Sequence, residues 1–249
     1  MLRSGNPALG DNTFTTVAAF DAPSDVMTLQ GAVNKSFILL FLVVLSAAMS
    51  WVFLPTLVPP EIMLPTIFGA SIAGLITGIV VVFKKNVAPV LAPVYALLEG
   101  VVLGLLSFFM EMAYPGIVVQ AVVLTFGIFF TLLLLYKSRI IPVTENFKLG
   151  IAAATGGIMI LYLVNLGLRL FGAAGIGFIH ESGALGIGFS VFVVIIASLN
   201  LVLDFDFIEK GAEMNAPKYM EWYAAFGLIV TLIWLYIEIL RLLSKLRRR

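Results

Sequence analysis

Long runs of apolar residues, separated by short polar segments that contain proline or glycine, dominate the chain after residue 35. Each run approaches the roughly 20 residues that a helix needs to cross the hydrocarbon core of a bilayer. There are seven runs: 36–54, 63–83, 91–110, 116–136, 149–171, 183–203 and 222–243. The alternating pattern of a membrane β-barrel is absent, and helices are the other spanning structure that satisfies its own backbone. The pattern therefore predicts an all-α, polytopic membrane protein with seven transmembrane helices.

The two ends of the chain differ from this pattern. Residues 1–35 are rich in Asp, Asn, Thr, Pro and Gly and contain no apolar run, so they do not read as a secretory signal. We expect a polar tail over 1–35, a membrane domain over 36–245 and a basic tail over 246–249.

Lys and Arg residues predict the orientation of the spans. The amino-terminal tail and the segments after the second, fourth and sixth runs contain nine of them, whereas the alternate segments contain at most Arg169. Because basic residues accumulate on the cytoplasmic side, we expect the amino terminus in the cytoplasm. The basic residues at the carboxyl-terminal end conflict with this assignment, because seven spans would place them outside the cytoplasm. Either that end is exported, or the last run re-enters the membrane and returns.

Composition agrees with a membrane protein and excludes several functions. The chain is 61% hydrophobic and 12% charged, with a mean hydropathy of +1.10, whereas a soluble domain is about 25% charged. Its 15 basic and 14 acidic residues nearly cancel, which gives no reason to expect a nucleic-acid partner. The absence of cysteine excludes disulfides and thiolate metal sites, and one histidine excludes multi-histidine metal motifs. We expect no resident cofactor.

Small residues recur at helical spacing in two of the predicted spans. Gly74 and Gly78 lie on one face of the second span, and Ala96, Gly100, Gly104 and Ser107 on one face of the third. Small residues allow close backbone approach, which holds helices together in lipid. We interpret these faces as helix-packing surfaces.

Ionisable residues inside a membrane helix are costly, by about 2.5–3.5 kcal/mol on insertion scales, and therefore indicate function. Glu99 lies in the middle of the third run and Glu238 well inside the seventh, while Asp204 and Asp206 end the sixth, with Asn200 one turn before Asp204. Glu99, Asp206 and Asn200 are candidates either for a place on an ion path or for polar contacts that hold helices together, and both possibilities remain open. Asp206 faces away from Asp204, and ordinary helix-end solvation would also explain it.

Two acids buried together in low dielectric favour a switch. Burial disfavours the charged form and mutual repulsion disfavours it further, so such a pair shares a proton near neutral pH. Once ionised, the pair attracts a hard cation such as Ca²⁺. Asp204 and Glu238 are the candidate pH sensor, ion gate and Ca²⁺ ligands. The alternative is a solvated loop acid together with a structural buried acid. Glu238 lies 16 residues after Trp222, about 24 Å along a helix, so the acids meet only if the sixth helix continues through Asp206 or the seventh begins outside the bilayer.

From Gly31 to Arg241 the chain resembles the Bax inhibitor-1/YccA-like family, in its bacterial branch. The resemblance rests on five segments: APVYALLEG at 92–100, VTENFK at 143–148, AATGG at 153–157, NLVLDFDFIE at 200–209 and WLYIEILRLL at 234–243.

This resemblance implies six helices wrapped around a central seventh. It also implies a pH-sensitive Ca²⁺ leak, gated by acids on the sixth and seventh helices and latched by an arginine on the second. Asp204 matches the first acid, and Glu238 stands where the family often has Asp. The second span has no arginine, only Lys84 and Lys85 at its end, which leaves these two lysines as the candidate latch.

Three function classes follow from these expectations. The first is a pH-sensitive Ca²⁺ leak channel in a bacterial inner membrane, with lipid, protons and Ca²⁺ as its partners. The second is a non-transporting regulator or partner of a membrane-embedded protease, to which YccA-like relatives are tied. An intramembrane enzyme is the third, and we expect no catalytic activity. The Gly-x-Gly-Asp setting of aspartyl intramembrane proteases is absent, and His180 lies in a glycine-rich loop that is expected at the surface.

Overall fold

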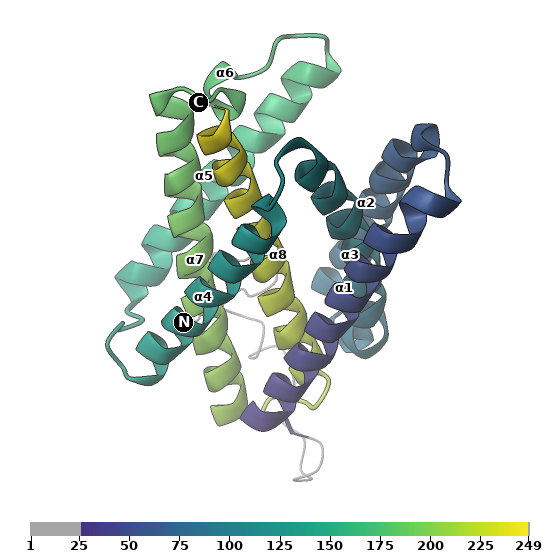
Figure 1. The fold of residues 1–249 in the computed structure, drawn as a ribbon. Coiled ribbons are helices and arrows are strands. Elements are labelled where there is room, and N and C mark those ends of the chain that lie inside the picture. The colour runs from purple at the N-terminus through teal and green to yellow at the C-terminus, as the bar shows by residue number, and fades with distance from the viewer. Residues whose placement is uncertain (1–25, 249) are drawn as a thin grey trace. The chain divides into compact units, whose positions relative to one another are not determined.

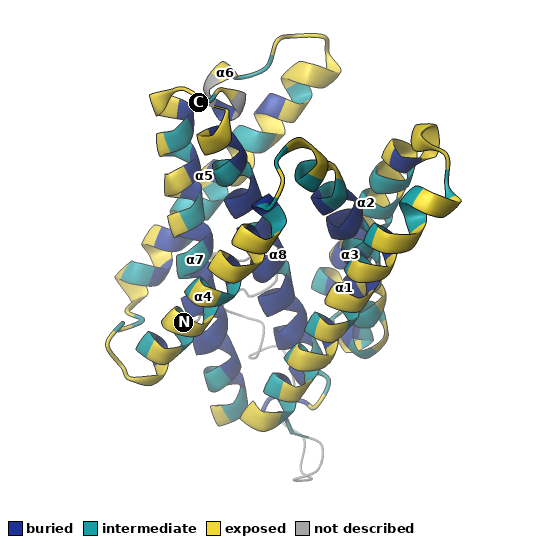
Figure 2. Ribbon diagram, viewed as in Figure 1, coloured by how far each residue is buried: buried dark blue, intermediate teal, exposed yellow. Residues whose placement is uncertain are grey.

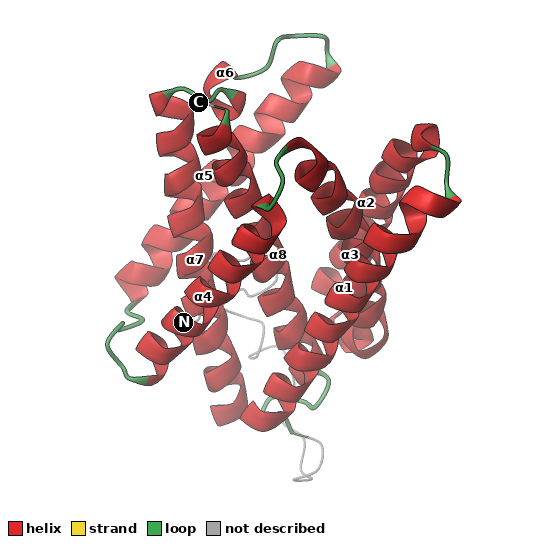
Figure 3. Ribbon diagram, viewed as in Figure 1, coloured by secondary structure: helices red, strands yellow, loops and turns green. Residues whose placement is uncertain are grey.

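The computed structural model describes residues 26–248, apart from the side chains of Phe178 and His180. Helices make up its regular secondary structure, and seven of them are long and apolar enough to cross a membrane (Figures 1 and 3). They are α1 (Leu29–Leu57), α2 (Pro60–Phe83), α3 (Ala88–Ala113), α4 (Ile117–Lys137), α5 (Glu145–Leu170), α7 (Ala184–Glu213) and α8 (Met220–Arg247). The prediction of seven apolar helices is confirmed. Two short helices, η2 (Lys85–Val87) and α6 (Gly177–His180), lie in loops.

Local sequence explains where several helices begin. The Thr28 hydroxyl accepts a hydrogen bond from the Gly31 N–H and caps α1, and the Thr144 hydroxyl caps α5 by accepting from Phe147. Pro60 stands at the first position of α2, where its missing N–H leaves no intrahelical bond unmade. Gly116 adopts a φ of 80° before α4, a conformation that glycine reaches without steric cost.

Most of the spanning helices are longer than the predicted apolar runs, and α1 and α7 extend furthest beyond them. α1 starts at Leu29 rather than residue 36, because the cap at Thr28 begins the helix before the apolar run begins. α7 continues to Glu213, ten residues beyond the predicted end at Leu203, so Asp204 and Asp206 lie within the helix. α8 is one uninterrupted helix from Met220 to Arg247, two residues longer at its start and four longer at its end than the predicted run.

The chain divides into two compact units, which we describe separately. Unit 1 contains Gly116–Asp206 and Thr231–Arg249, and unit 2 contains the residues up to Pro115 that the structure describes, together with Phe207–Val230. α7 and α8 each contribute one part to unit 1 and the other part to unit 2. α8 has the largest buried share of the seven spans, although its predicted place at the centre of the other six stays a prediction (Figure 2).

In unit 2, α1 and α3 pack closely along the predicted small-residue face. A Cβ atom added at Gly100 would lie 2.6 Å from Ser46 Cβ and 2.7 Å from the Val43 carbonyl oxygen, and one added at Gly104 would overlap the backbone of Ala47. The Ser46 hydroxyl donates across this contact to the Leu97 carbonyl at 2.7 Å. The glycines thus permit backbone contact and interhelical hydrogen bonding.

The residues that precede α1 are hydrogen-bonded to the start of α8 within unit 2. Glu221 Oε1 accepts hydrogen bonds from the Thr28 N–H at 3.0 Å and the Thr28 hydroxyl at 2.9 Å, and Lys218 Nζ lies 2.7 Å from the same oxygen. The Met27 N–H donates to the Ala216 carbonyl nearby. Gly31 is required here, because an added Cβ would overlap the Glu221 carboxyl group.

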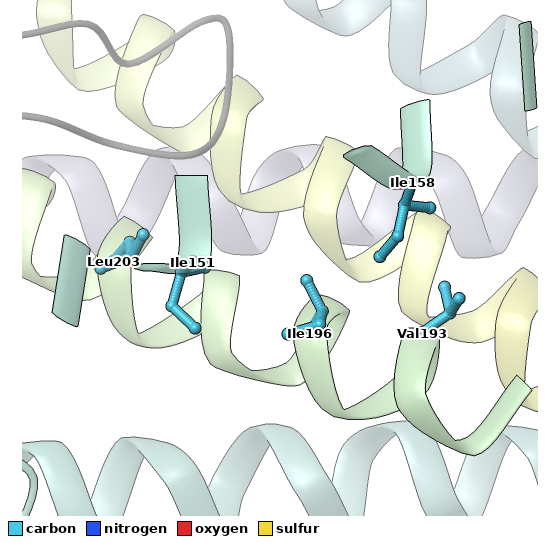
Figure 4. Close-up of a cluster of buried hydrophobic side chains, with 5 residues drawn as sticks. All are labelled: Ile151, Ile158, Val193, Ile196 and Leu203. Atoms are coloured by element: carbon cyan, nitrogen blue, oxygen red, sulfur yellow. The ribbon is translucent and has the colours of Figure 1, made fainter. Parts of the chain in front are cut away.

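The core of unit 1 lies between α5 and α7. Five buried apolar residues form a cluster there, with Trp234 of α8 packed against it (Figure 4). They are Ile151, Ile158, Val193, Ile196 and Leu203. Large apolar side chains elsewhere on the helices are exposed, among them Phe41, Ile72 and Phe130, as expected for lipid-facing positions.

Candidate functional site

Buried and half-buried polar side chains lie along the contact between α5, α7 and α8 in unit 1, and we call this set the polar column. Its α5 members are Lys148, Thr155 and Tyr162, which follow one another at intervals of seven residues. Seven residues are nearly two helical turns, so the three side chains share one face of α5. Their partners on α7 and α8 are Asp206, Asn200, Glu238 and Arg241.

At one end of the column, Lys148 and Asp206 form an ion pair. Lys148 Nζ lies 3.2 Å from Asp206 Oδ2 and 3.1 Å from Glu145 Oε1. The side chains of Lys148 and Asp206 are only 3% and 12% exposed, so desolvation of each charge is offset by the other. The alternative of ordinary helix-end solvation does not hold for Asp206, because α7 continues past it and brings it against α5.

In the middle of the column, Asn200 joins α7 to α5. Its amide nitrogen donates to the Thr155 hydroxyl at 2.8 Å and to the Ile196 carbonyl at 2.9 Å. Asp204 follows one turn later on α7 and is completely buried. Ile151, Ile196 and Leu203 of the apolar cluster lie close by in sequence on the same two helices, which gives this stretch a low dielectric surrounding (Figure 4).

Further along the column, Glu238 is held by two partners. The Tyr162 hydroxyl donates to Glu238 Oε1 at 3.0 Å, and Arg241 NH1 donates to both carboxylate oxygens at 2.7 and 2.8 Å. Arg241 NH1 also donates to the Tyr162 oxygen at 2.6 Å. Arg241 thereby neutralises an acid that is 1% exposed.

The column ends at Lys245, near the carboxyl end of α8. Its Nζ donates to the Gly186 carbonyl at 2.9 Å and to the Ser190 hydroxyl at 2.8 Å, and the residue is buried. This contact places Lys245 opposite residues 186–190 of α7 and fixes the register of the two helices.

The register sets the relation between the two predicted acids. Thr155 of α5 lies opposite Asn200 of α7, and this contact defines one level along the helix axes. Tyr162, the partner of Glu238, lies seven residues from that level on α5. Asp204 lies four residues from the same level on α7, in the opposite direction. The levels of the two acids are thus separated by about 16 Å along the helix axes. Asp204 and Glu238 are both buried in one unit on neighbouring helices, but they occupy different levels of the column and do not form a direct clasp.

The remaining candidate residues lie in unit 2. Glu99 is partly exposed on α3, and its carboxyl group lies against Gly74 of α2. Lys84 ends α2, and Lys85 Nζ lies 5.8 Å from the centroid of the Tyr223 ring. The lysine latch stays a prediction.

Lys148, Thr155, Tyr162 and Lys245 were not among the site residues expected from sequence. A signal for three of them exists in the seven-residue spacing along α5, which places polar groups on one face of an otherwise apolar helix. Lys245 carries no such signal, because a lysine at a helix end reads as a solvated or orienting charge.

Within residues 26–248, no group of three or more His, Cys, Asp or Glu side chains is arranged to hold a metal ion. The acids of the column are instead distributed along its length and paired with Lys148 and Arg241. Carboxylates arranged in this way can contact a cation one after another, and they can exchange protons as separate groups.

Seven apolar helices and a buried polar column define a multi-pass membrane protein of the helical-bundle class. The chain belongs to the Bax inhibitor 1 like family, whose model matches residues 6–248. A search of the curated proteins gives no match. The family predicted from the five sequence segments is confirmed.

Proposed function

We propose that this Bax inhibitor 1 like protein is a pH-sensitive leak pathway for a hard cation such as Ca²⁺, with the polar column of unit 1 as its route. The observation that carries the proposal is the burial of two acids, Asp204 and Glu238, at different levels of the polar column. Acids within a membrane protein mark ion and proton pathways. No catalytic role is part of the proposal.

The ion pairs of the column correspond to a closed pathway. Lys148 neutralises Asp206 and Arg241 neutralises Glu238, so a cation that enters must replace a basic side chain at each of these levels. Opening therefore requires the two pairs to separate, after which carboxylate oxygens, the ligands that Ca²⁺ prefers, become available.

Proton binding competes with cation binding on the same oxygen atoms. A protonated carboxyl group attracts Ca²⁺ less than a carboxylate does, so cation flux is expected to rise with pH. In this mechanism, Asp204 and Glu238 act as successive cation-binding sites rather than as one hydrogen-bonded pair.

Flux measurements on the purified full chain in vesicles test the proposal. Vesicles loaded with a Ca²⁺ dye should show flux that increases as the pH is raised, because deprotonated carboxyl groups bind the cation more strongly. Asp204→Asn and Glu238→Gln should each alter this profile. Glu61→Gln, an exposed acid at the start of α2, is the matched control and should behave as the wild type.

Equal flux from empty and protein-containing vesicles at every pH would rule out the proposed channel function. The alternative, a regulator or partner of a membrane-embedded protease, then gains support if deletion of the polar tail abolishes a cellular phenotype. We place the protein in the bacterial inner membrane with a cytoplasmic amino terminus, as part of the same proposal.

A further inference from the structure

We propose that Glu99 forms a second acidic site, independent of the polar column: a proton-binding carboxyl group in the middle of the membrane that lipid-soluble reagents can reach. The site belongs wholly to unit 2, whereas the column belongs to unit 1. It is argued from the surroundings of Glu99 and does not depend on ion flux.

Glu99 is the twelfth of the 26 residues of α3, and it therefore lies near the middle of a span. Its Oε1 atom lies 2.8 Å from the position that a Cβ atom at Gly74 would occupy. Gly74 is buried, while Leu75 and Ile72 beside it on α2 are exposed. The carboxyl group thus rests on the bare backbone of α2, and part of the residue remains exposed.

The elements packed around Glu99 offer no basic partner at this level. α2 contains one ionisable residue, Glu61 in its first turn, and α1 contains only Lys35, also near its start. On α3 itself the nearest ionisable side chain is Tyr95, whose ring packs against Phe226 with centroids 4.9 Å apart. Residues 207–230 contribute Glu209, Lys210, Glu213, Lys218, Tyr219, Glu221 and Tyr223.

Among residues 26–248, none of the hydrogen bonds or ion pairs involves the Glu99 carboxyl group. An ionised carboxylate in that position would have neither a counter-charge nor donors, so the neutral acid is the favoured form. A neutral carboxylic acid in mid-membrane carries a proton that it can exchange, and it is also the form that reacts with carbodiimides.

Dicyclohexylcarbodiimide is the probe for this chemistry. The carboxyl proton moves to one nitrogen of the N=C=N group while the carboxylate oxygen bonds to its central carbon, giving an O-acylisourea. An acyl shift from oxygen to nitrogen then yields a stable N-acylurea. The reaction is an addition, so no atom leaves and no oxidant or reductant is needed, and the peptide gains the mass of one reagent molecule.

The experiment uses the full chain in lipid vesicles and measures labelled peptides by mass spectrometry. We expect Glu99 to be labelled about tenfold more than the exposed Glu61, because only the mid-membrane acid is both neutral and reached from lipid. A water-soluble carbodiimide should reverse this preference. Labelling of Glu99 should decrease as the pH is raised, since the reaction requires the protonated form.

Gly74→Ala is the sharpest variant. The added Cβ would meet the end of the flexible Glu99 side chain, so the carboxyl group must move while the helices keep their contact. Labelling of Glu99 is then expected to change at least about threefold with little change in thermal unfolding. Gly69→Ala, at a position on α2 where an added Cβ meets nothing within 4 Å, is the matched control and should leave labelling unchanged.

Absence of label on Glu99 in the folded wild-type chain, or label on Glu99 and Glu61 in equal amounts, overturns the proposal. So does an identical effect of Gly74→Ala and Gly69→Ala. These outcomes are independent of the flux measurements, because labelling is read at a residue of unit 2 and requires no transport.

Discussion

Lys148 Nζ and Asp206 Oδ2 lie 3.2 Å apart inside unit 1, and they join α5 to the last turns of the α7 segment in that unit. Both side chains are largely removed from solvent, so each charge is stabilised mainly by the other rather than by water. Removal of a single charged group should therefore reduce the stability of the protein most strongly at this end of the polar column.

Lys148→Met should strongly destabilise the protein, because it removes the partner of a buried carboxylate. Breaking a buried ion pair by removing one member costs about 3–5 kcal/mol. Thermal unfolding of the purified protein in detergent measures the effect. Glu145→Gln is the control: its side chain is 59% exposed, and an exposed pair contributes at most about 1 kcal/mol. Equal losses for the two variants would contradict the assignment.

Tyr162→Phe should weaken the contact between α5 and α8 while leaving the ring in place. The variant removes a hydrogen bond to a charged acceptor, which contributes about 1.5–3 kcal/mol. A double-mutant cycle with Glu238→Gln checks the cause. The two effects should be non-additive by about 0.5–3 kcal/mol, since the residues share one network, whereas additive effects would show that Tyr162 acts elsewhere.

Gly100→Ala should destabilise unit 2 by about 1–3 kcal/mol through overpacking. The new methyl group would press on Ser46 Cβ and the Val43 carbonyl oxygen, and a backbone atom cannot turn aside as a flexible side chain can. Gly127→Ala on α4, where an added Cβ meets nothing within 4 Å, is expected to be neutral. Unfolding midpoints of the two variants, measured in the same detergent, provide the comparison.

Thr28→Ala should loosen the start of α1. It removes a helix cap, which contributes about 1 kcal/mol, and it takes one donor from the buried Glu221 carboxyl group. Hydrogen exchange of the first turn of α1 should accelerate in this variant. Thr28→Ser keeps the hydroxyl and should exchange as the wild type does; faster exchange in both variants would point to packing of the methyl group instead.

The seven spans could be predicted because hydropathy and length alone decide whether a helix crosses a membrane. The helix ends could not, since they depend on caps and tertiary contacts. α1 begins seven residues early because Thr28 is held by Glu221, almost the whole chain away in sequence. α7 extends through Asp206 because Lys148 of α5 provides a counter-charge there.

Burial of Glu238 could likewise be predicted, because it lies within an apolar run, whereas Asp204 directly follows a run and is buried because α7 continues beyond it. Their separation could not, because it is set by the register of α5, α7 and α8, and register comes from contacts such as Asn200 with Thr155. The roles of Arg241 and Lys245 were also hidden, since a basic residue near a helix end is usually solvated or at the interface.

The seven-residue interval between Lys148, Thr155 and Tyr162 has a mechanical consequence. An α-helix drifts only about 20° over that interval, so a turn of α5 about its own axis would carry all three side chains away from α7 and α8 together. The contacts of the three side chains with α7 and α8 would then break together. Loss of the contact at Lys148 would therefore also weaken the contact at Tyr162, and the reverse.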